Sequence, residues 1–337
     1  MNYRDITDLN GDTRLFAQEL PIDVDLVVGI PRSGLLVANY LSLYLDVPMT
    51  DVDGLCNGTV FDTGNRFPED FSFEQLDSVI VVDDSVLSGN QMTETRSRLD
   101  AHEIPFDISY AAVYVSSWGH RYVDYWGEVV PVPRVFEWNL LHHSLLKNFC
   151  VDIDGVLCRN PTPEENDDGE NYRQFLSEVE PNIVPNQPIG WLVTSRLEQY
   201  RPETEAWLDR HGIEYDRLVM LDLPDQEARQ ELGQYAQYKA EVYDETGADL
   251  FIESEPEQAV EISELTNKPV FCYDTYEMIQ PGGVGRAYQK SASILSKFSA
   301  DPVGFTGFLG KRFLYRCHHL IGNNALVSSR SGRSDQE

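Results

Sequence analysis

Basic residues are scarce in this chain, and lysine most of all. The 337 residues contain 26 Lys and Arg against 56 Asp and Glu, a formal net charge of −30, and only six of the basic residues are lysines. An acidic, lysine-poor surface keeps a protein hydrated in concentrated salt, where screening shortens the self-repulsion of like charges. We therefore predict a halophilic protein of haloarchaeal type, with an ordinary acidic protein as the alternative. Because nucleic acids are polyanions, so negative a chain is not expected to bind them broadly.

Paired cysteines and long apolar runs are also missing. The cysteines are scattered without CxxC spacing, as expected of reduced thiols and not of a disulfide framework or a zinc site. They are Cys56, Cys150, Cys158, Cys272 and Cys317. The polar, acidic N-terminus is unlike a signal peptide, and no apolar run approaches the ~20 residues that a membrane span needs. We therefore expect a cytoplasmic protein without a membrane span, and a homo-oligomer stays open.

Short apolar runs alternate with longer amphipathic stretches, which is typical of parallel sheets covered by helices. The runs are 26–30, 79–82, 110–115, 149–151, 190–193, 250–252 and 270–272. A chain of this length favours two domains, and a new motif begins at Phe149. We therefore predict an α/β protein with two domains, each a mostly parallel sheet flanked by helices. The expected domains are residues 1–145 and 146–295, followed by a basic and aromatic, partly disordered tail over residues 296–337.

Two stretches of the first predicted domain carry groups suited to phosphate and sugar. The turn at 31–34 reads Pro-Arg-Ser-Gly and precedes a helical stretch, where backbone N–H groups and an arginine attract anions. After the second strand, Asp83 and Asp84 lead into a loop of Ser, Gly and Asn that opens a helix. Adjacent acids at a strand end hold ribose hydroxyls or a hydrated Mg²⁺, and such a loop holds a phosphate. The plainer alternative is an acidic turn with a helix N-cap.

These segments resemble the pyrophosphate-binding loop and the PRPP-binding signature of type I phosphoribosyltransferases, over roughly residues 20–140. The resemblance implies that Asp83 and Asp84 bind the ribose hydroxyls of PRPP, the 5-phosphoribosyl 1-pyrophosphate donor. Arg32 and Ser33 would contact its pyrophosphate and a metal ion, and residues 87–91 would bind its 5-phosphate. The PRPP-binding residues implied in this way are Arg32, Ser33, Gly34, Asp83, Asp84, Ser85, Leu87, Ser88, Gly89, Asn90 and Gln91. The family loop often reads Thr-Thr-Gly with a further Thr or Ser, and this chain has one hydroxyl fewer.

Two further regions carry expectations from that resemblance. The Gly-rich stretch 54–73 is long for a connection, and in the family a mobile loop in this region closes over PRPP. A plain surface hairpin is the alternative. The region 118–138 corresponds to the hood that sets base specificity. There, Phe136 or Trp138 either stacks on a base or packs at the domain junction.

The second predicted domain opens with the sharpest motif of the chain. Strand 149–151 ends in Asp152-Ile153-Asp154-Gly155. The turn at Gly155 lets both carboxylates converge on one metal ion. A surface acidic turn or a calcium-type loop is the plainer alternative.

This motif resembles the first motif of the haloacid dehalogenase (HAD) superfamily, whose other three motifs follow in order. The resemblance implies that Asp152 is the nucleophile that forms an aspartyl-phosphate. Asp154 would be the acid/base that protonates the leaving oxygen and later activates water. Mg²⁺ would be the cofactor, with Glu253 ahead of Glu255 as a ligand because Ser254 takes the place of the usual second acid. The implied metal ligands are Asp152, Asp154, Glu253 and Glu255.

The remaining motifs supply hydroxyls and cations. Thr194 fits the second motif as a donor to the phosphoryl group, with Ser195 as the fallback, and Lys239 fits the third motif as the balancing cation. Arg196 and Arg201 either touch substrate phosphate or pair with glutamates on a helix surface. About 33 residues separate the Asp-x-Asp motif from the next strand, too few for a cap domain, so we expect an open site. The stretch 190–220 further resembles phosphatase domains that act on nucleotides or polynucleotide ends.

Three functions compete at this point. The leading hypothesis is a bifunctional enzyme: a phosphoribosyltransferase that joins PRPP to a base or amine, and a Mg²⁺-dependent phosphohydrolase. The phosphohydrolase would act on a phosphorylated small molecule or nucleotide, in nucleotide, base or phosphosugar metabolism. Alternatively, the first domain is a non-catalytic PRPP or nucleotide sensor that regulates the phosphatase. The third hypothesis is a non-catalytic interaction protein that docks through its basic and aromatic tail.

The charge composition predicts a steep dependence of stability on salt. Diluting KCl lengthens the Debye length from roughly 3 Å at 1 M to about 10 Å at 0.1 M, so the repulsion among the acidic side chains grows. The melting temperature, measured by calorimetry across this range, should fall continuously with dilution. A melting temperature that stays constant from 1 M to 0.1 M KCl would leave an ordinary acidic protein.

Overall fold

The structure is a computed structural model. It describes residues 1–283 apart from 22, 62–72, 74, 75, 103, 105, 225–227 and 229–234. Contacts within the chain divide it into two compact units. Among the described residues, the five-stranded unit contains Thr7–Val132, and the six-stranded unit contains Met1–Ile6 together with residues 133–283. The tail predicted for residues 296–337, which includes Cys317, lies outside the described residues.

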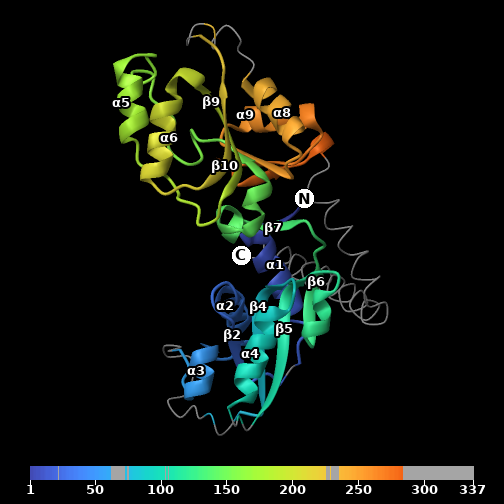
Figure 1. The fold of residues 1–337 in the computed structure, drawn as a ribbon. Coiled ribbons are helices and arrows are strands. Elements are labelled where there is room, and N and C mark those ends of the chain that lie inside the picture. The colour runs from blue at the N-terminus through green and yellow to red at the C-terminus, as the bar shows by residue number, and fades with distance from the viewer. Residues whose placement is uncertain are drawn as a thin grey trace, which may run out of the picture. The chain divides into compact units, whose positions relative to one another are not determined.

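The five-stranded unit is built on an entirely parallel sheet of strand order β3-β2-β4-β5-β6 (Figure 1). Its strands are β2 (Leu26–Gly29), β3 (Met49–Asp51), β4 (Ser78–Val86), β5 (Asp107–Val115) and β6 (Tyr125–Val129). Its helices are α1 (Ile6–Phe16, which starts at the boundary), α2 (Gly34–Leu45), α3 (Val52–Asn57), α4 (Asn90–Asp100) and the 3₁₀ turn η2 (Gly119–Tyr122).

Helices lie on both faces of this sheet, which explains the unbroken apolar runs of its strands. On one face, Val52 of α3 and Met92 of α4 pack against Val28 and Val81. On the other face, β2 approaches α2 so closely that a Cβ at Gly29 would lie 2.8 Å from a main-chain atom of that helix. The central strands are therefore fully buried, and polar side chains have room only at the strand ends.

The six-stranded unit has the strand order β10-β9-β8-β11-β12-β13, in which β13 alone runs antiparallel to its neighbour. The strands are β8 (Phe149–Val151), β9 (Ile189–Leu197), β10 (Tyr215–Leu221), β11 (Leu250–Glu253), β12 (Val270–Cys272) and β13 (Glu277–Ile279). A separate two-stranded parallel sheet joins β1 (Asn2–Arg4) to β7 (Arg134–Phe136). The helices and 3₁₀ turns are η3 (Glu137–His142), η4 (Ser144–Asn148), α5 (Glu170–Glu178), η5 (Glu198–Tyr200), α6 (Arg201–Arg210), α8 (Tyr235–Thr246), α9 (Pro256–Thr266) and η6 (Pro281–Gly283).

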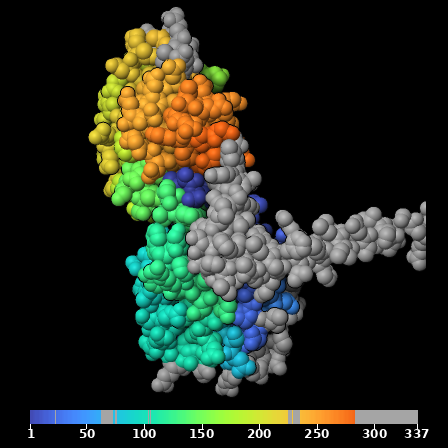
Figure 2. Space-filling model, turned by 90° about the vertical axis from the view of Figure 1, so that its right-hand side faces the viewer, coloured from blue at the N-terminus to red at the C-terminus, as the bar shows by residue number. Residues whose placement is uncertain are grey.

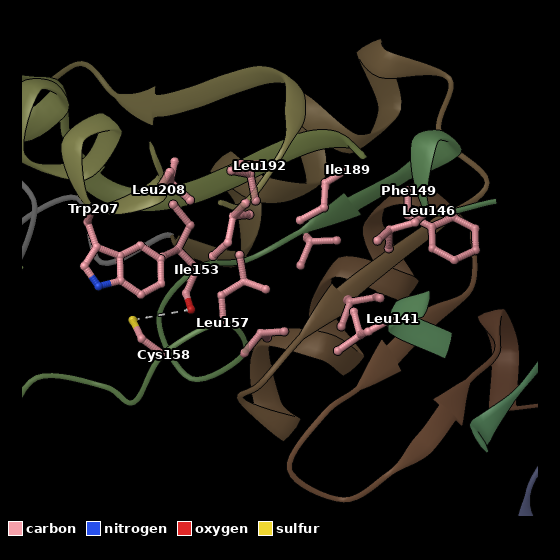
Figure 3. Close-up of a cluster of buried hydrophobic side chains, with 14 of the residues drawn as sticks. Leu141, Leu146, Phe149, Ile153, Leu157, Cys158, Ile189, Leu192, Trp207 and Leu208 are labelled. Atoms are coloured by element: carbon pink, nitrogen blue, oxygen red, sulfur yellow. Dashed lines mark hydrogen bonds between the residues drawn. The ribbon is translucent and has the colours of Figure 1, made fainter. Parts of the chain in front are cut away.

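Alternation along the short strand β8 divides the core of this unit between the two faces of the sheet. Phe149 points to the face covered by α5 and α6, where it joins Leu192 and Trp207 (Figure 3). Cys150 points to the opposite face and packs with α8 and α9, whose residues form most of the orange surface in Figure 2. Beyond the strand, the Cys158 thiol donates to the main-chain oxygen of Ile153 at 3.8 Å (Figure 3). This hydrogen bond closes the turn of the Asp-x-Asp motif.

The predicted fold class is confirmed: the protein is α/β, and both large sheets are mostly parallel. All seven apolar runs are strands, but two strands continue further than the runs. β4 includes the acid pair and ends at Val86, and β9 includes Thr194 and Arg196. The reason lies in the neighbouring strands, because β5 continues pairing with β4 up to Val115. Among the described residues, no helix is both long and apolar enough to cross a membrane.

The division of the chain differs from the predicted boundary at residue 145. The contacts place it between Val132 and Pro133, and the first six residues pack with the later part of the chain. Tyr3 shows why: it is 5% exposed, its ring lies 5.6 Å from that of Phe271, and its hydroxyl donates to the carbonyl of Tyr276 at 3.4 Å. The six-stranded unit is therefore assembled from two separate segments of the chain.

Tyr3→Ala should loosen the six-stranded unit selectively. Loss of a buried aromatic ring costs about 3 kcal/mol, and amide hydrogen exchange in β11 and β12 should accelerate accordingly. Tyr3→Phe is the control, because it keeps the ring and removes one hydrogen bond worth about 1 kcal/mol. Faster exchange in β4 and β5, with β11 and β12 unchanged, would contradict the assignment of the first residues to this unit.

Candidate functional sites

The acid pair of the five-stranded unit lies at the carboxyl end of its central strand. Asp83 and Asp84 are 9% and 4% exposed. Because β2 ends at Gly29, which pairs with Val82, the two acids continue past the end of the neighbouring strand. Oδ1 of Asp83 accepts the N–H of Asp84 at 2.9 Å. The carboxyl edge of such a sheet is where ligands of open α/β folds bind.

The turn after β2 lies directly against this pair. The Ser33 hydroxyl donates to Oδ1 of Asp84 at 2.8 Å. Gly34 leaves no space for a side chain, because a Cβ there would lie 2.7 Å from a main-chain oxygen of β4 and 3.1 Å from the Asp83 carboxylate. Arg32 is exposed beside this turn. Ser33, Gly34, Asp83 and Asp84 thus come together. The exposed Arg32 precedes Ser33 in the sequence.

The predicted phosphate loop leads from β4 into α4. Gly89 is the N-cap residue of α4 with φ of 79°, and a Cβ there would lie 2.2 Å from the ring of Tyr122. Backbone conformation and space therefore both require glycine at this position. The Ser88 hydroxyl oxygen accepts the N–H of Asn90 at 3.4 Å. The exposed residues around this N-terminus are Leu87, Ser88, Asn90 and Gln91, and Ser85 is half-buried in β4.

The electrostatics of this site suit a ligand with hydroxyl donors and a phosphate. Burial raises the pKa of Asp83 well above its usual value, and the charge of Asp84 raises it further. Each first-turn N–H of α4 lacks a carbonyl partner within the helix, and the helix dipole is positive at this end. Hydroxyl groups that donate to the acids would offset the cost of their buried charge, while a phosphate would match the helix end.

The region 118–138, expected from the sequence to form the hood, is divided between the two units, and only residues 118–132 belong to the five-stranded unit. Phe136 is the last residue of β7 and is 4% exposed. Its ring stacks on that of Trp138 at 4.8 Å and 8°. Both residues fall in the six-stranded unit, so the structure favours the packing alternative over stacking on a base. Of the proposed loop 54–73, residues 62–72 lie outside the described part of the chain.

In the six-stranded unit, Lys239 joins two acids from neighbouring strands. Its Nζ donates to Oδ2 of Asp152 and to Oε2 of Glu253, both at 2.6 Å. Asp152 follows β8, Glu253 ends β11, and Lys239 lies on α8. All three are at most 4% exposed. Lys239 and Glu253, which are 14 residues apart in the sequence, thus form a direct ion pair.

Asp154 has a different cation. Arg196 Nη2 donates to its Oδ1 at 2.7 Å and Nε donates to its Oδ2 at 3.0 Å, a two-point pair. The main-chain oxygen of Asp154 accepts the Ser254 hydroxyl at 3.3 Å. Gly155, with φ of 83°, turns the chain here, and a Cβ on it would lie 2.1 Å from that hydroxyl oxygen. The two acids of the motif therefore share one edge of the sheet but have separate partners.

The remaining predicted residues divide between this cluster and its surroundings. Thr194 is fully buried, and its Oγ1 accepts the N–H of Arg196 at 3.2 Å. Glu255 lies outside the ion-pair cluster, since its carboxylate accepts from Asn160 at 3.1 Å. Glu253 therefore belongs to the cluster, and the order of preference between Glu253 and Glu255 as metal ligands stays a prediction.

Burial controls the charges of this cluster. Burial raises the pKa of Asp152 to about 7, and the neighbouring acids Glu253 and Asp154 act in the same direction, against the opposing effect of Lys239. Burial opposes the charge of Lys239 as well, but its two acidic partners raise its pKa above the ordinary value. Three acids thus share two cations, which leaves one negative charge uncompensated.

The cluster fits Mg²⁺ in donor chemistry. Among the described residues, no group of three His, Cys, Asp or Glu is already arranged around a metal position. Carboxylate oxygens are the ligands that Mg²⁺ prefers, and Asp152, Asp154 and Glu253 supply them with one charge in excess. A bound Mg²⁺ would have to compete with Lys239 and Arg196 for these oxygens.

Sequence reasoning missed the role of Arg196. The two arginines of this region looked alike, yet their surroundings differ. Arg201 is half-exposed and pairs with Glu198 and Glu205 on the surface of α6. Arg196 is 1% exposed and pairs with Asp154. The available signal was its position two residues after Thr194, on the same face of β9.

Comparisons with known proteins give only distant likenesses. No family model and no curated protein matches the chain. Among solved structures, it resembles the xanthine-guanine-hypoxanthine phosphoribosyltransferase of Helicobacter pylori, with 16% identity, 41% of this chain and 92% of that chain covered, and a TM-score of 0.32. A purine phosphoribosyltransferase of Pyrococcus horikoshii shares 21% identity over 41% and 92% of the two chains, with a TM-score of 0.30. Likenesses this weak assign no function to the chain.

Proposed function

We propose that the chain is a bifunctional enzyme, with a PRPP-dependent phosphoribosyltransferase site on the five-stranded unit and a HAD-type, Mg²⁺-dependent phosphohydrolase site on the six-stranded unit. The observation that carries the proposal is the cluster in which Lys239 joins Asp152 to Glu253, with Asp154 beside it. In the five-stranded unit, a buried acid pair and a glycine-capped helix N-terminus support the other activity.

The phosphohydrolase reaction has two steps. The Asp152 carboxylate attacks phosphorus and the leaving oxygen departs with a proton from Asp154. Water then attacks the phosphorus of the aspartyl-phosphate and gives a proton to Asp154, and the bond from phosphorus to the Asp152 oxygen breaks, which releases phosphate and restores the carboxylate. Lys239 balances the charge on the phosphoryl oxygens, and the buried Thr194 hydroxyl donates to one of them. Mg²⁺ held by carboxylate oxygens of the cluster would supply further positive charge. The substrate is a phosphorylated small molecule or a nucleotide.

The transferase reaction depends mainly on binding and orientation. Asp83 and Asp84 accept hydrogen bonds from the ribose hydroxyls, and the first turn of α4 binds the 5-phosphate. Arg32 and Ser33 hold pyrophosphate. The bond from ribose C1 to the pyrophosphate oxygen breaks, and a nitrogen of the base or amine bonds to C1. Pyrophosphate leaves with the electron pair of the broken bond.

One observation favours a second candidate, in which the five-stranded unit only senses PRPP or a nucleotide and regulates the phosphohydrolase. In the loop 87–91 Ser88 alone carries a hydroxyl, and its oxygen already accepts a main-chain N–H. Release of pyrophosphate in the presence of PRPP and a panel of bases and amines distinguishes the two. A sensor binds PRPP and releases none.

PRPP binding, measured by calorimetry in Mg²⁺ and high salt, should depend on the acid pair. Asp83→Asn or Asp84→Asn should weaken it roughly 10-fold or more, because each removes a charged hydrogen-bond acceptor. Asp83→Asn should also raise the melting temperature at pH 7. A carboxyl whose folded-state pKa is raised destabilises the fold at pH values above that pKa. The melting temperatures of Asp83→Asn and the wild-type protein should therefore converge as the pH falls through the folded-state pKa of Asp83.

Asp53→Asn is the matched control for this measurement, because Asp53 is an exposed acid of the same unit that pairs with Arg98. It should leave the affinity for PRPP unchanged. If the wild-type protein shows no binding heat with PRPP or with any nucleoside monophosphate, neither the transferase nor the sensor function stands.

Phosphate release from a panel of phosphorylated metabolites tests the second site. Asp152→Asn removes the nucleophile and keeps its shape, so the rate should drop at least about 1,000-fold without loss of the fold. EDTA should abolish the wild-type rate. Asp249→Asn, at the opposite end of β11 where Asn148 contacts it, is the control and should retain activity. Full turnover by Asp152→Asn, or turnover in EDTA, would contradict the assignment.

A further inference from the structure

The guanidinium of Arg196 is completely enclosed in the six-stranded unit. Its side chain is 0% exposed, whereas the carboxylate that it binds, on Asp154, is 18% exposed. The pair therefore has an inner cation and an outer acid. Only the acid is partly exposed, and the described hydrogen bonds of the guanidinium go to Asp154, Thr204 and Cys158.

Several groups hold the guanidinium in this position. Its Nη1 donates to the Thr204 hydroxyl at 3.4 Å and its Nη2 to the Cys158 sulfur at 3.3 Å, while its Cζ lies 6.0 Å from the centre of the Trp207 ring. Thr204 and Trp207 are both buried residues of α6. Acceptors on two sides and a ring on a third thus fix the plane of the guanidinium, and through it the plane of the carboxylate.

An irregularity in β9 directs this side chain inward. Val219 pairs with Val193 and Leu221 pairs with Leu197. An advance of two residues along β10 therefore corresponds to an advance of four residues along β9. Such bulges re-aim side chains and are frequent next to active sites. The same segment connects Arg196 to a second predicted group, because its main-chain N–H donates to Thr194 Oγ1. That bond uses an acceptor site of the hydroxyl and leaves its proton available for a ligand.

We propose that Arg196 is a positioning residue of the phosphohydrolase site: its side chain fixes the orientation of the Asp154 carboxylate, and its main chain orients the Thr194 hydroxyl. This inference rests on the proposed phosphohydrolase function. Arg196 acts on the reaction only through these two groups. Its loss should therefore lower kcat and leave KM near the wild-type value, whereas a phosphate-binding arginine would mainly affect KM.

Arg196→Gln tests the proposal, with Mg²⁺ and a substrate found active with the wild-type protein. Loss of an outer partner that orients a reacting group reduces activity about 10–100-fold, and we expect this loss in kcat. Arg196→Lys keeps the charge but cannot make the two-point pair, so it should recover only part of the loss. Arg201→Gln is the matched control: it makes the same change in a surface arginine and should behave as wild type.

A double-mutant cycle with Asp154→Asn separates positioning from general support of the fold. Once Asp154 is altered, Arg196→Gln should cause little further loss of kcat, because the group that it orients is already gone. The double variant also removes both charges of the pair, which keeps it folded if Arg196→Gln alone is unstable. Millimolar guanidinium should restore part of the rate of Arg196→Ala and none of that of Arg196→Ala with Asp154→Asn.

Three results would overturn the positioning role while the phosphohydrolase function stands. In the first, the double variant loses kcat by the product of the two single losses. In the others, Arg196→Gln mainly raises KM, or it keeps the wild-type rate. A wild-type protein that releases phosphate from no compound of the panel overturns both.

Discussion

The six-stranded unit depends on one buried ammonium group. Lys239 donates to two buried carboxylates that come from the ends of β8 and β11. An uncompensated buried charge costs several kcal/mol, and removing one partner of such a group is more harmful than replacing the whole group. The ion pairs connect α8 to the two central strands of the sheet. They also keep both acids at the edge where β8 and β11 end.

The two candidate sites meet the cost of buried acids in different ways. In the six-stranded unit, Lys239 and Arg196 compensate three carboxylates. In the five-stranded unit, the described partners of the acid pair are a hydroxyl of Ser33 and a main-chain N–H. The raised pKa of Asp83 expresses that difference. The first site thus holds three acids against two cations, and in the second site hydroxyl donors of a ligand would stabilise the buried acids.

The sequence was informative where chemistry follows local pattern. Apolar runs located the central strands, and the acids at their ends located both sites. The spacing between Lys239 and Glu253 suggested a cation near the acids. Contacts between distant segments could not be read in this way. Alternation along β9 places Arg196 on the same face as Thr194, but no pattern in the sequence shows that α6 buries it. For Phe136 the sequence left stacking on a base and packing open, because its pairing with β1 joins distant segments.

The assembly of the six-stranded unit from two segments has a consequence for the order of events during synthesis. Tyr3 is made before Thr7–Val132, but β7 and Phe271 are made only after that whole segment. Domains generally fold as units while the chain emerges. The first strand must therefore wait, unpaired, through the folding of the entire five-stranded unit. Until β7 has been made, the main-chain N–H and C=O groups of β1 lack their partner strand and stay available to chaperones or to a neighbouring nascent chain.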